Sequence, residues 1–278
     1  NNTFNYLISF ITYSYYNFYM FQKNILSELI KISYEAGILI MDIYDQDFEV
    51  NHKDDNSPVT IADKKAEQFI LEKLNKLFPS IPVISEEAYS KKFLPNYDNE
   101  FFLVDPLDGT KEFIIKNDEF TVNIAYVENG ITQIGLINVP AKNNIFFNDE
   151  KNSYLINTKY KNQLSIDDAK QIKVNLEKEK KLIATISRSH KSKETENYLK
   201  NYDIEKINYI GSSYKFCLIA SGEADIYPRM SPTCEWDTAA GHAILKKAGG
   251  NVTLLNGEEL RYGFKEKNFK NPYFVAKN

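Results

Sequence analysis

Residues 101–110 read FFLVDPLDGT, an apolar run that leads into two aspartates. The apolar run is typical of a buried strand, which places Asp105 at the carboxyl end of that strand. Pro106 stiffens the turn that follows, and Asp108 returns to the same side three residues after Asp105. Two carboxylates that converge at a strand end, with the Leu107 carbonyl as a neutral oxygen, can bind hard divalent cations.

The backbone that follows Asp108 is suited to an anion. Gly109 permits close approach of the chain, and the N–H groups of Gly109 and Thr110 can face an anionic group at the start of a helix or turn. For the Asp-Gly pair alone, a plain hairpin turn is the commoner explanation. The full motif after a buried strand favours a site that holds a cation and an anion together.

Two further carboxylates are candidates for the same site. Residues 83–85 form a short apolar strand signal that runs into Glu86 and Glu87, which taken alone would be a solvated pair. At the edge of the same sheet, Glu86 would complete a metal cluster. Asp237 precedes a helical pattern over 238–248, where it is expected to be the N-cap and could also bind a cation.

The loop before the second helical pattern contains a candidate base. Asp55 lies in the segment Asp-Asn-Ser-Pro-Val-Thr, and Ser57 or Thr60 can cap the helix that follows. A loop and a cap would explain these residues without any chemistry. The functional interpretation makes Asp55 a base that activates a water molecule, acting through the Thr110 hydroxyl.

Two strand–helix junctions in the second half of the chain are candidate substrate contacts. Residues 187–190 read Ser-Arg-Ser-His, and residues 211–215 read Gly-Ser-Ser-Tyr-Lys. Hydroxyl, guanidinium, imidazole and ammonium groups at such junctions suit a phosphate or a nucleotide, although each junction could equally be a routine helix cap. Arg229, at the end of another strand, is a weaker candidate.

The motifs occur together and in order, and from about Met20 to the C-terminus the chain resembles the inositol monophosphatase superfamily of metal-dependent, lithium-sensitive phosphatases. The Asp-Pro-Leu-Asp-Gly-Thr motif and the Trp-Asp pair are specific for the superfamily. The Lys-Glu-Phe that follows Thr110, and the Ser-Arg-Ser-His motif, point to its bacterial 3'(2'),5'-bisphosphate nucleotidase branch. The resemblance implies an α/β fold, a layered αβαβα sandwich with the site between two halves.

The resemblance also implies a role for each candidate residue. Asp55 and Thr110 would be catalytic and would activate the water. Two or three Mg²⁺ ions would be held by Glu86, Asp105, the Leu107 carbonyl, Asp108 and Asp237. Substrate would be contacted by Glu86, Gly109, Thr110, Ser187, His190, Gly211, Lys215 and Asp237, with Arg229 as a helper.

The implied reaction removes the 3'-phosphate of adenosine 3',5'-bisphosphate, a by-product of sulfate assimilation and sulfotransfer, to give AMP and phosphate. The sulfated form of this nucleotide is a further candidate substrate. One alternative is the same chemistry on inositol monophosphate or a related sugar or polyol phosphate. An alternative of another class is a non-catalytic module that binds a nucleotide or a cation.

Apolar periodicity divides the chain into three parts. Residues 1–19 are an aromatic-rich extension without charged residues, and Met20 is a candidate start. Residues 20–165 are expected to form an N-terminal α+β half with the metal site, and residues 166–278 an α/β half packed with it as one catalytic unit.

The pattern predicts helices after Met20 and after Thr60, and then strands at 120–128, 131–139, 144–148 and 153–157 that form an antiparallel meander. In the second half it predicts strands at 182–187, 206–210, 224–228 and 251–255 and helices at 192–200, 212–221 and 238–248.

Composition excludes several classes of protein. The 278 residues contain 34 Lys and Arg against 38 Asp and Glu, a net charge of −4, so a nucleic-acid-binding surface is not expected. The two cysteines exclude a disulfide framework and favour a reducing, cytoplasmic location, and a structural zinc site is not expected.

Residues 1–19 lack the pattern of a signal peptide or a membrane span, which leaves an added helix or strand, or peripheral contact with the inner membrane face, as alternatives. The partner is expected to be a small nucleotide bisphosphate, and the oligomeric state stays open.

Overall fold

Side chains alternate across the strand that contains the aspartate motif, and two cores form on its two faces. In the computed structural model, which describes residues 25–53, 58–158, 164–177 and 181–278, Phe101 and Leu103 belong to one apolar cluster. Phe102 and Val104 belong to the other. The strand, β4 (Glu100–Asp108), is therefore buried on both sides, as the apolar run predicts.

β4 belongs to a seven-stranded sheet with the order β3-β4-β5-β6-β7-β8-β9. β3 (Val83–Ser85) pairs parallel to β4, and every later pair is antiparallel, so the predicted meander is confirmed. The last strand lies beyond the boundary expected between residues 165 and 166. The remaining strands of this sheet are β5 (Thr121–Glu128), β6 (Ile131–Val139), β7 (Asn144–Asn148), β8 (Ser153–Asn157) and β9 (Lys170–Ile172).

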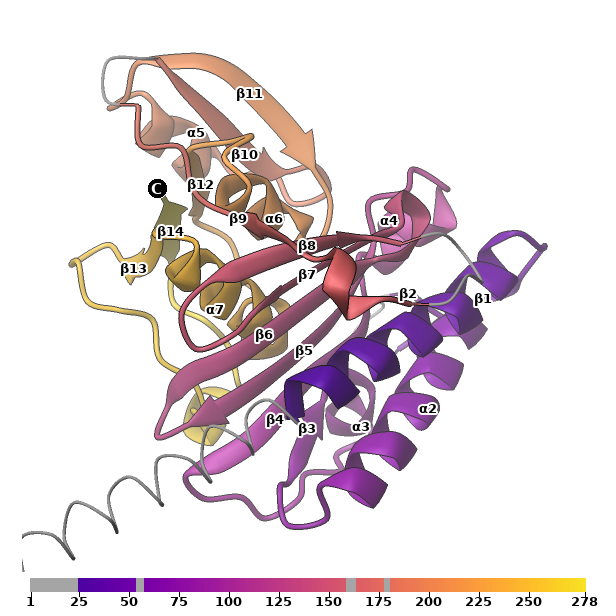
Figure 1. The fold of residues 1–278 in the computed structure, drawn as a ribbon. Helices are drawn as coiled ribbons and strands as arrows, with labels where there is room; N and C mark the ends of the chain where they lie inside the picture. The colour runs from indigo at the N-terminus through magenta and orange to yellow at the C-terminus, as the bar shows by residue number, and fades with distance from the viewer. Residues whose placement is uncertain (1–24, 54–57, 159–163, 178–180) are drawn as a thin grey trace, which may run out of the picture.

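Two helices cover one face of the seven-stranded sheet, as Figure 1 shows. The first spans 25–44, and residues 20–24 of the helix predicted after Met20 lie outside the described part of the chain. The second is α2 (Ile61–Leu77), and Thr60 caps it as predicted by accepting a hydrogen bond from the Ala62 N–H at 3.1 Å. A small pair of strands, β1 (Val50–His52) and β2 (Pro58–Thr60), precedes α2.

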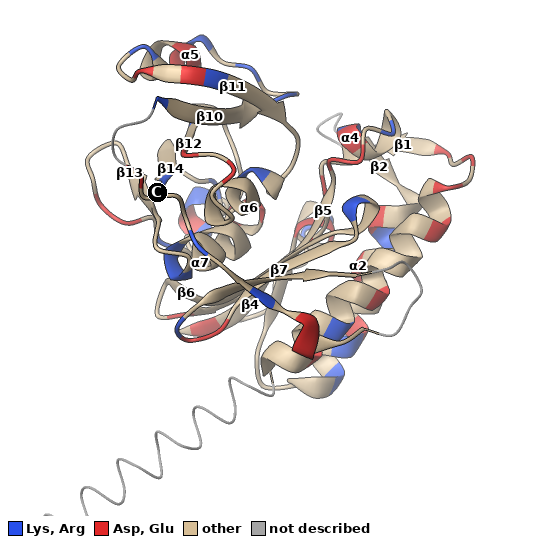
Figure 2. Cartoon of the chain, turned by 45° about the horizontal axis from the view of Figure 1, so that its top comes forward, with Lys and Arg blue, Asp and Glu red and all other residues tan. Residues whose placement is uncertain are grey.

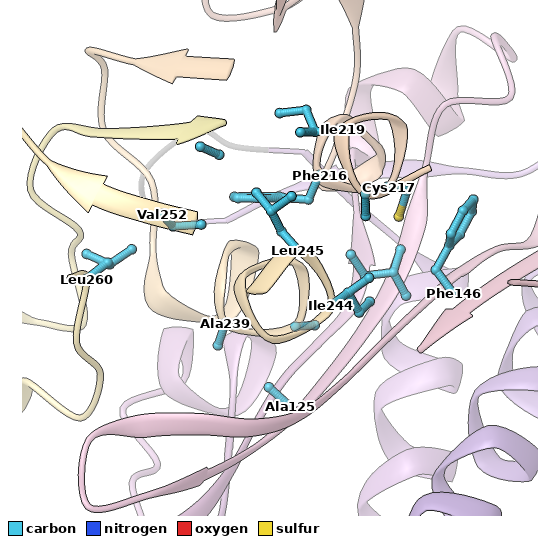
Figure 3. Close-up of a cluster of buried hydrophobic side chains, with 14 of the residues drawn as sticks. Ala125, Phe146, Phe216, Cys217, Ile219, Ala239, Ile244, Leu245, Val252 and Leu260 are labelled. Carbon is cyan, nitrogen blue, oxygen red and sulfur yellow. The ribbon is translucent and has the colours of Figure 1, made fainter. Parts of the chain in front are cut away.

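The opposite face of the sheet packs against α6 (Tyr214–Ala220) and α7 (Ala239–Lys247). Figure 3 shows Phe216 and Cys217 of α6 gathered beside Ile244 and Leu245 of α7. These two helices separate the seven-stranded sheet from a five-stranded one with the order β11-β10-β12-β14-β13. Its strands are β10 (Leu182–Ser187), β11 (Ile204–Ile210), β12 (Ile226–Arg229), β13 (Asn251–Leu254) and β14 (Phe274–Lys277).

α5 (Lys193–Leu199) covers the outer face of the five-stranded sheet, where Leu199 packs with Ile186 and Ile226. The layers therefore run α, β, α, β, α, which confirms the predicted sandwich. Among the described helices none is long and apolar enough to cross a membrane. The short helical elements are α3 (Glu86–Ser90), α4 (Thr110–Ile114), η1 (Pro140–Lys142), η2 (Ile166–Asp168), η3 (Glu235–Asp237) and η4 (Lys265–Lys267).

Charged residues of both signs lie side by side on the outer elements. Figure 2 shows blue and red segments intermixed along α2 and along β11. No extended strip of one sign is visible on these elements. The absence of a nucleic-acid-binding surface stays a prediction from the net charge of −4.

Replacing Gly135 by Ala is expected to destabilise the fold by about 1–3 kcal/mol. A Cβ atom at Gly135 of β6 would lie 2.1 Å from the backbone oxygen of Ala240 on α7, and backbone cannot turn aside as a side chain can. Urea unfolding of the variant measures the loss. Gly257→Ala is the control, because no atom lies within 4 Å of its added Cβ and only its φ of +88° opposes the change. A loss below about 0.5 kcal/mol in Gly135→Ala would contradict the packing explanation.

Candidate metal and phosphate site

Three carboxylates from three segments of the chain converge at one edge of the seven-stranded sheet. Glu86 follows β3, Asp105 lies in β4, and Asp237 ends η3. Parallel pairing of Ser85 with Val104 sets Glu86 beside Asp105. One oxygen from each of the three side chains lies within 4.8 Å of the others, which is a spacing that one metal ion could bridge.

The cluster is electrostatically unfavourable without a cation. Burial, and then the charges of Glu86, Asp108 and Asp237, raise the pKa of Asp105 well above its usual range. Burial, and then Asp108 and Glu86, raise the pKa of Asp237 in the same way. Buried carboxylate oxygens that repel one another are suitable ligands for Mg²⁺ or Ca²⁺, so these residues fit a divalent metal.

Lys53 contributes the cation nearest to Glu86. Its Nζ atom lies 2.7 Å from Glu86 Oε1 and 2.5 Å from Glu87 Oε1. Burial acts to lower the pKa of Lys53, but the two carboxylates raise it overall. Lys53 and Glu87 were not among the predicted site residues, and the adjacency of Glu87 to Glu86 was the only signal for either.

Asp108 lies beside the cluster and is held by the second half of the chain. Its Oδ2 atom accepts hydrogen bonds from the Ser213 N–H at 2.5 Å and from Asn123 Nδ2 at 3.3 Å. Burial raises the pKa of Asp108 to about 6, although Lys215 opposes that change. The Leu107 N–H donates to Asp105 Oδ1 at 3.0 Å, which fixes the turn between the two aspartates.

Thr110 is paired with a carboxylate, Asp63, that was not among the predicted site residues. Thr110 Oγ1 lies 3.0 Å from Asp63 Oδ1 and 3.3 Å from the Leu107 carbonyl oxygen. Asp63 is buried in the first turn of α2, where its Oδ2 atom also accepts the Thr60 N–H at 2.7 Å. The predicted base, Asp55, lies outside the described residues. Thr60 and Asp63 form a capping box at the start of α2, and nothing in the sequence placed Asp63 near Thr110.

The expectation that Asp237 caps the helix over 238–248 is wrong. α7 begins after Thr238, and the Asp237 carboxylate instead accepts the Cys234 N–H at 2.8 Å. The reason is the 3-10 turn of η3, which turns the Asp237 side chain back toward Cys234 and leaves it facing the acidic cluster.

A cleft of about 350 Å³ opens between the two halves beside these groups. Most of the predicted substrate contacts line it, whereas Gly211 is not among its described lining residues. Three cationic residues that the prediction omitted or ranked low, Lys111, Arg229 and Lys270, line it too. The predicted contacts that do so are Glu86, Gly109, Thr110, Ser187, His190, Lys215 and Asp237.

Buried positive charge also lines the cleft, close enough to the acidic cluster that Lys215 opposes the rise in the pKa of Asp108 and Arg229 opposes that of Asp237. Burial, and then the nearby charge of Arg229, lower the pKa of Lys215 to about 8. The same two causes, with Lys111, lower the pKa of His190 to about 4, so this imidazole is neutral at pH 7. Arg229 is buried, and its guanidinium donates to the carbonyls of Ser231 and Pro232. The cleft thus brings carboxylates that can hold a cation together with basic residues that can hold an anion, as a phosphate ester that binds metal requires.

Gly109 allows the backbone to turn directly after Asp108. Its φ of +90° lies in the left-handed region, which a side chain would disfavour. An added Cβ would also come within 3.1 Å of the Glu119 backbone oxygen. The backbone at Gly109 therefore leaves no room for a side chain, and its approach to an anion stays a prediction.

Comparison with known proteins identifies the family. The sequence profile of the Inositol monophosphatase family matches residues 22–278. The chain belongs to the inositol monophosphatase family. Members of this family are metal-dependent, which agrees with the acidic cluster at the sheet edge.

Among relatives within the inositol monophosphatase family, the chain is 40% identical to the 3'(2'),5'-bisphosphate nucleotidase CysQ of Salmonella typhimurium, over 90% of this chain and 98% of that protein. It is 31% identical to the CysQ of Haemophilus influenzae, over 91% and 92% of the two chains. Among solved structures, CysQ from Bacteroides thetaiotaomicron matches with a TM-score of 0.76 at 38% identity, covering 92% of this chain and 97% of that one. The inositol monophosphatase of Thermotoga maritima also has a TM-score of 0.76, but at 23% identity this likeness shows the fold alone.

Divalent cation binding is expected to strengthen as the pH rises through about 6, because Asp108 has a pKa of about 6 and must lose its proton before it can bind a cation. Folded carboxyl groups with raised pKa values bind more protons than the unfolded chain does. The metal-free fold should therefore lose stability as the pH rises from the unfolded Asp value of about 3.9 toward the folded value. Calorimetric titration with Mg²⁺ in buffers of different ionisation enthalpy counts the protons released, and melting of the metal-free protein follows the stability. Binding of Mg²⁺ to Asp108→Asn should release fewer protons than binding to the wild type. A cation affinity that is constant between about pH 5 and 8 would contradict the role given to Asp108.

Proposed function

We propose that the protein is a Mg²⁺-dependent phosphatase that converts adenosine 3',5'-bisphosphate to AMP and phosphate. The observation that carries the proposal is the cleft that Glu86 and Asp237 of the acidic cluster, Thr110 with Asp63 behind it, and the buried Lys215 border together. Relatives named as 3'(2'),5'-bisphosphate nucleotidases at 40% identity over nearly their whole length support the choice of substrate.

Mg²⁺ suits this site because every donor is an oxygen. Two or three ions would be held by Glu86, Asp105, the Leu107 carbonyl, Asp108 and Asp237. When bound, they would neutralise phosphate charge and polarise the phosphoryl group. In their presence the acidic end of the cleft would attract the 3'-phosphate that it otherwise repels.

Thr110 and Asp63 are the groups that we propose move the proton. Thr110 Oγ1 donates to Asp63 Oδ1 at 3.0 Å, so it can accept a proton from the attacking water while passing its own to the carboxylate. Burial raises the pKa of Asp63, which makes it a stronger base than an exposed aspartate. Asp63 thus takes the role first assigned to Asp55. The water attacks phosphorus in line, and the ribose 3'-oxygen leaves on the opposite side.

The basic residues of the cleft would bind the rest of the nucleotide. Lys215 and Arg229 are both buried, and they line the cleft together with Lys111 and Lys270. Fixed positive charge in the cleft favours a substrate with a second phosphate over one with a neutral polyol. Ser187, at the end of β10, would add a hydroxyl donor. Gly211 does not line the cleft itself, but it supports the 211–213 segment that does.

Phosphate release from adenosine 3',5'-bisphosphate and from inositol 1-phosphate, with and without Mg²⁺, tests the proposal. We expect turnover of the bisphosphate that requires Mg²⁺ and falls when Li⁺ is added, and little turnover of inositol 1-phosphate. AMP is the control, since a 5'-phosphate alone should not be released. Faster hydrolysis of inositol 1-phosphate would instead support an inositol monophosphatase, and no turnover of any substrate would support a binding module. The cytoplasmic location expected from the sequence stays a prediction.

A further inference from the structure

Two segments that border the cleft are held by one carboxylate from the other half of the molecule. Glu119, only 8% exposed, lies just before β5. The Arg188 guanidinium donates to it through Nε at 3.0 Å and through Nη2 at 2.8 Å. The Gly211 N–H donates to the same carboxylate at 2.7 Å. Glu119 therefore joins the 187–190 segment, the 211–213 segment and the seven-stranded sheet at one point.

A second carboxylate reinforces this junction. Glu112, in α4, accepts a hydrogen bond from the Ser189 hydroxyl. Gly211 packs directly against both acids, because a Cβ added to it would lie 2.4 Å from Glu112 Cγ and 2.8 Å from the Glu119 backbone oxygen. The two segments are also tied to each other by the Arg188 N–H, which donates to the Ile210 carbonyl at 3.2 Å.

The position of Arg188 differs from that of its neighbours. Ser187 and His190 line the cleft, and Arg188 is not among the described lining residues. Its guanidinium is turned to Glu119 and is not available as the phosphate ligand that the sequence motif suggested. A two-pronged arginine–carboxylate pair fixes both distance and orientation, which a single contact would not do.

We propose that Glu119 is a positioning residue that sets the enzyme's affinity for the nucleotide part of its substrate. Through Arg188 and Gly211 it fixes the wall that carries Ser187 and His190 relative to the metal-binding end. A ligand that occupies only the metal-binding end would not use this wall. The inference rests on the proposed function, because it assigns a nucleotide to that wall.

The test compares binding of AMP and of inorganic phosphate to the Mg²⁺-loaded protein by calorimetry. In Glu119→Gln we expect the Kd for AMP to rise about tenfold, since one charge-assisted contact is lost, and the Kd for phosphate to stay within about twofold. KM for adenosine 3',5'-bisphosphate should rise with the Kd for AMP while kcat changes little. Asp203→Asn is the matched control, because Asp203 and Lys181 form an exposed pair at 3.7 Å in the same half, and it should change neither constant.

Arg188→Lys provides a second variant, which keeps the positive charge but loses the paired guanidinium hydrogen bonds to Glu119. It should reproduce the selective loss, and the double variant should be no worse than the stronger single one, because both changes remove one interaction. Hydrogen exchange of the ligand-free protein should be faster at residues 187–190 and 211–213 in Glu119→Gln. Unchanged AMP binding, or equal weakening of AMP and phosphate, would overturn the proposal. Failure of the wild-type protein to hydrolyse the bisphosphate would instead reject the proposed function.

Discussion

Asp105→Asn is expected to lower kcat/KM for adenosine 3',5'-bisphosphate by about a thousandfold, because it removes a carboxylate from the centre of the proposed metal cluster. Asp105 is 2% exposed, and its oxygen lies within 4.8 Å of those of Glu86 and Asp237. An amide is neutral and binds Mg²⁺ far more weakly than a carboxylate does. The Mg²⁺ affinity, measured by calorimetry, should fall together with the activity.

The same substitution separates loss of metal from loss of fold. Because the charges around Asp105 raise its pKa, a neutral amide relieves repulsion, and the metal-free variant should melt no lower than the wild type. Asp118→Asn is the control: Asp118 accepts the Tyr44 hydroxyl at 2.8 Å and is not among the described residues of the cleft. Near-normal turnover by Asp105→Asn would reject the metal assignment.

Thr110→Val and Asp63→Asn are each expected to reduce kcat by about a hundredfold to ten-thousandfold while Mg²⁺ still binds. Each change removes one member of the hydrogen-bonded pair that we propose carries the proton. Thr110→Ser keeps the hydroxyl and should retain most of the activity. Steady-state kinetics at saturating Mg²⁺, with calorimetry for the metal, measure both quantities.

Asp63 also belongs to the helix cap, so a control must separate the two roles. Thr60→Ala removes the cap, which should lower the free energy of unfolding by about 1 kcal/mol, and leaves the contact between Asp63 and Thr110 in place. Its kcat should stay close to that of the wild type. If Asp63→Asn has normal activity and Asp55→Asn does not, the base is the one first predicted from the sequence.

The layered fold was predictable because its signals are local. The apolar run at 101–104 and the spacing of apolar residues in the long helices report burial directly from the sequence. The meander and the alternating second half followed in the same way and are confirmed. β14 was not predicted, because four residues at 274–277 carry little pattern and their partners, β12 and β13, are set by the tertiary fold.

The part of the site that could be predicted is the part whose residues lie close together in the sequence. Asp105 and Asp108 come from one motif, and the structure places both at the sheet edge. The pairing of Thr110 with Asp63 joins residues 47 positions apart, so it depends on where α2 begins relative to α4. The orientation of Asp237 depends on a 3-10 turn that the helical pattern after it concealed. Spacing along the chain could show which groups were available but not which of them meet.

The place of β14 in its sheet bears on how the protein is made. Phe274–Lys277 is synthesised after every other element of both sheets, yet it lies between β12 and β13 and pairs with each. A nascent chain on the ribosome cannot close that sheet until residue 277 has emerged. Arg229, at the end of β12, pairs with Phe274 and lines the cleft. A chain that stops before β14 would therefore lack the strand that pairs with β12 beside the cleft, so catalytic competence would come only after β14 has paired.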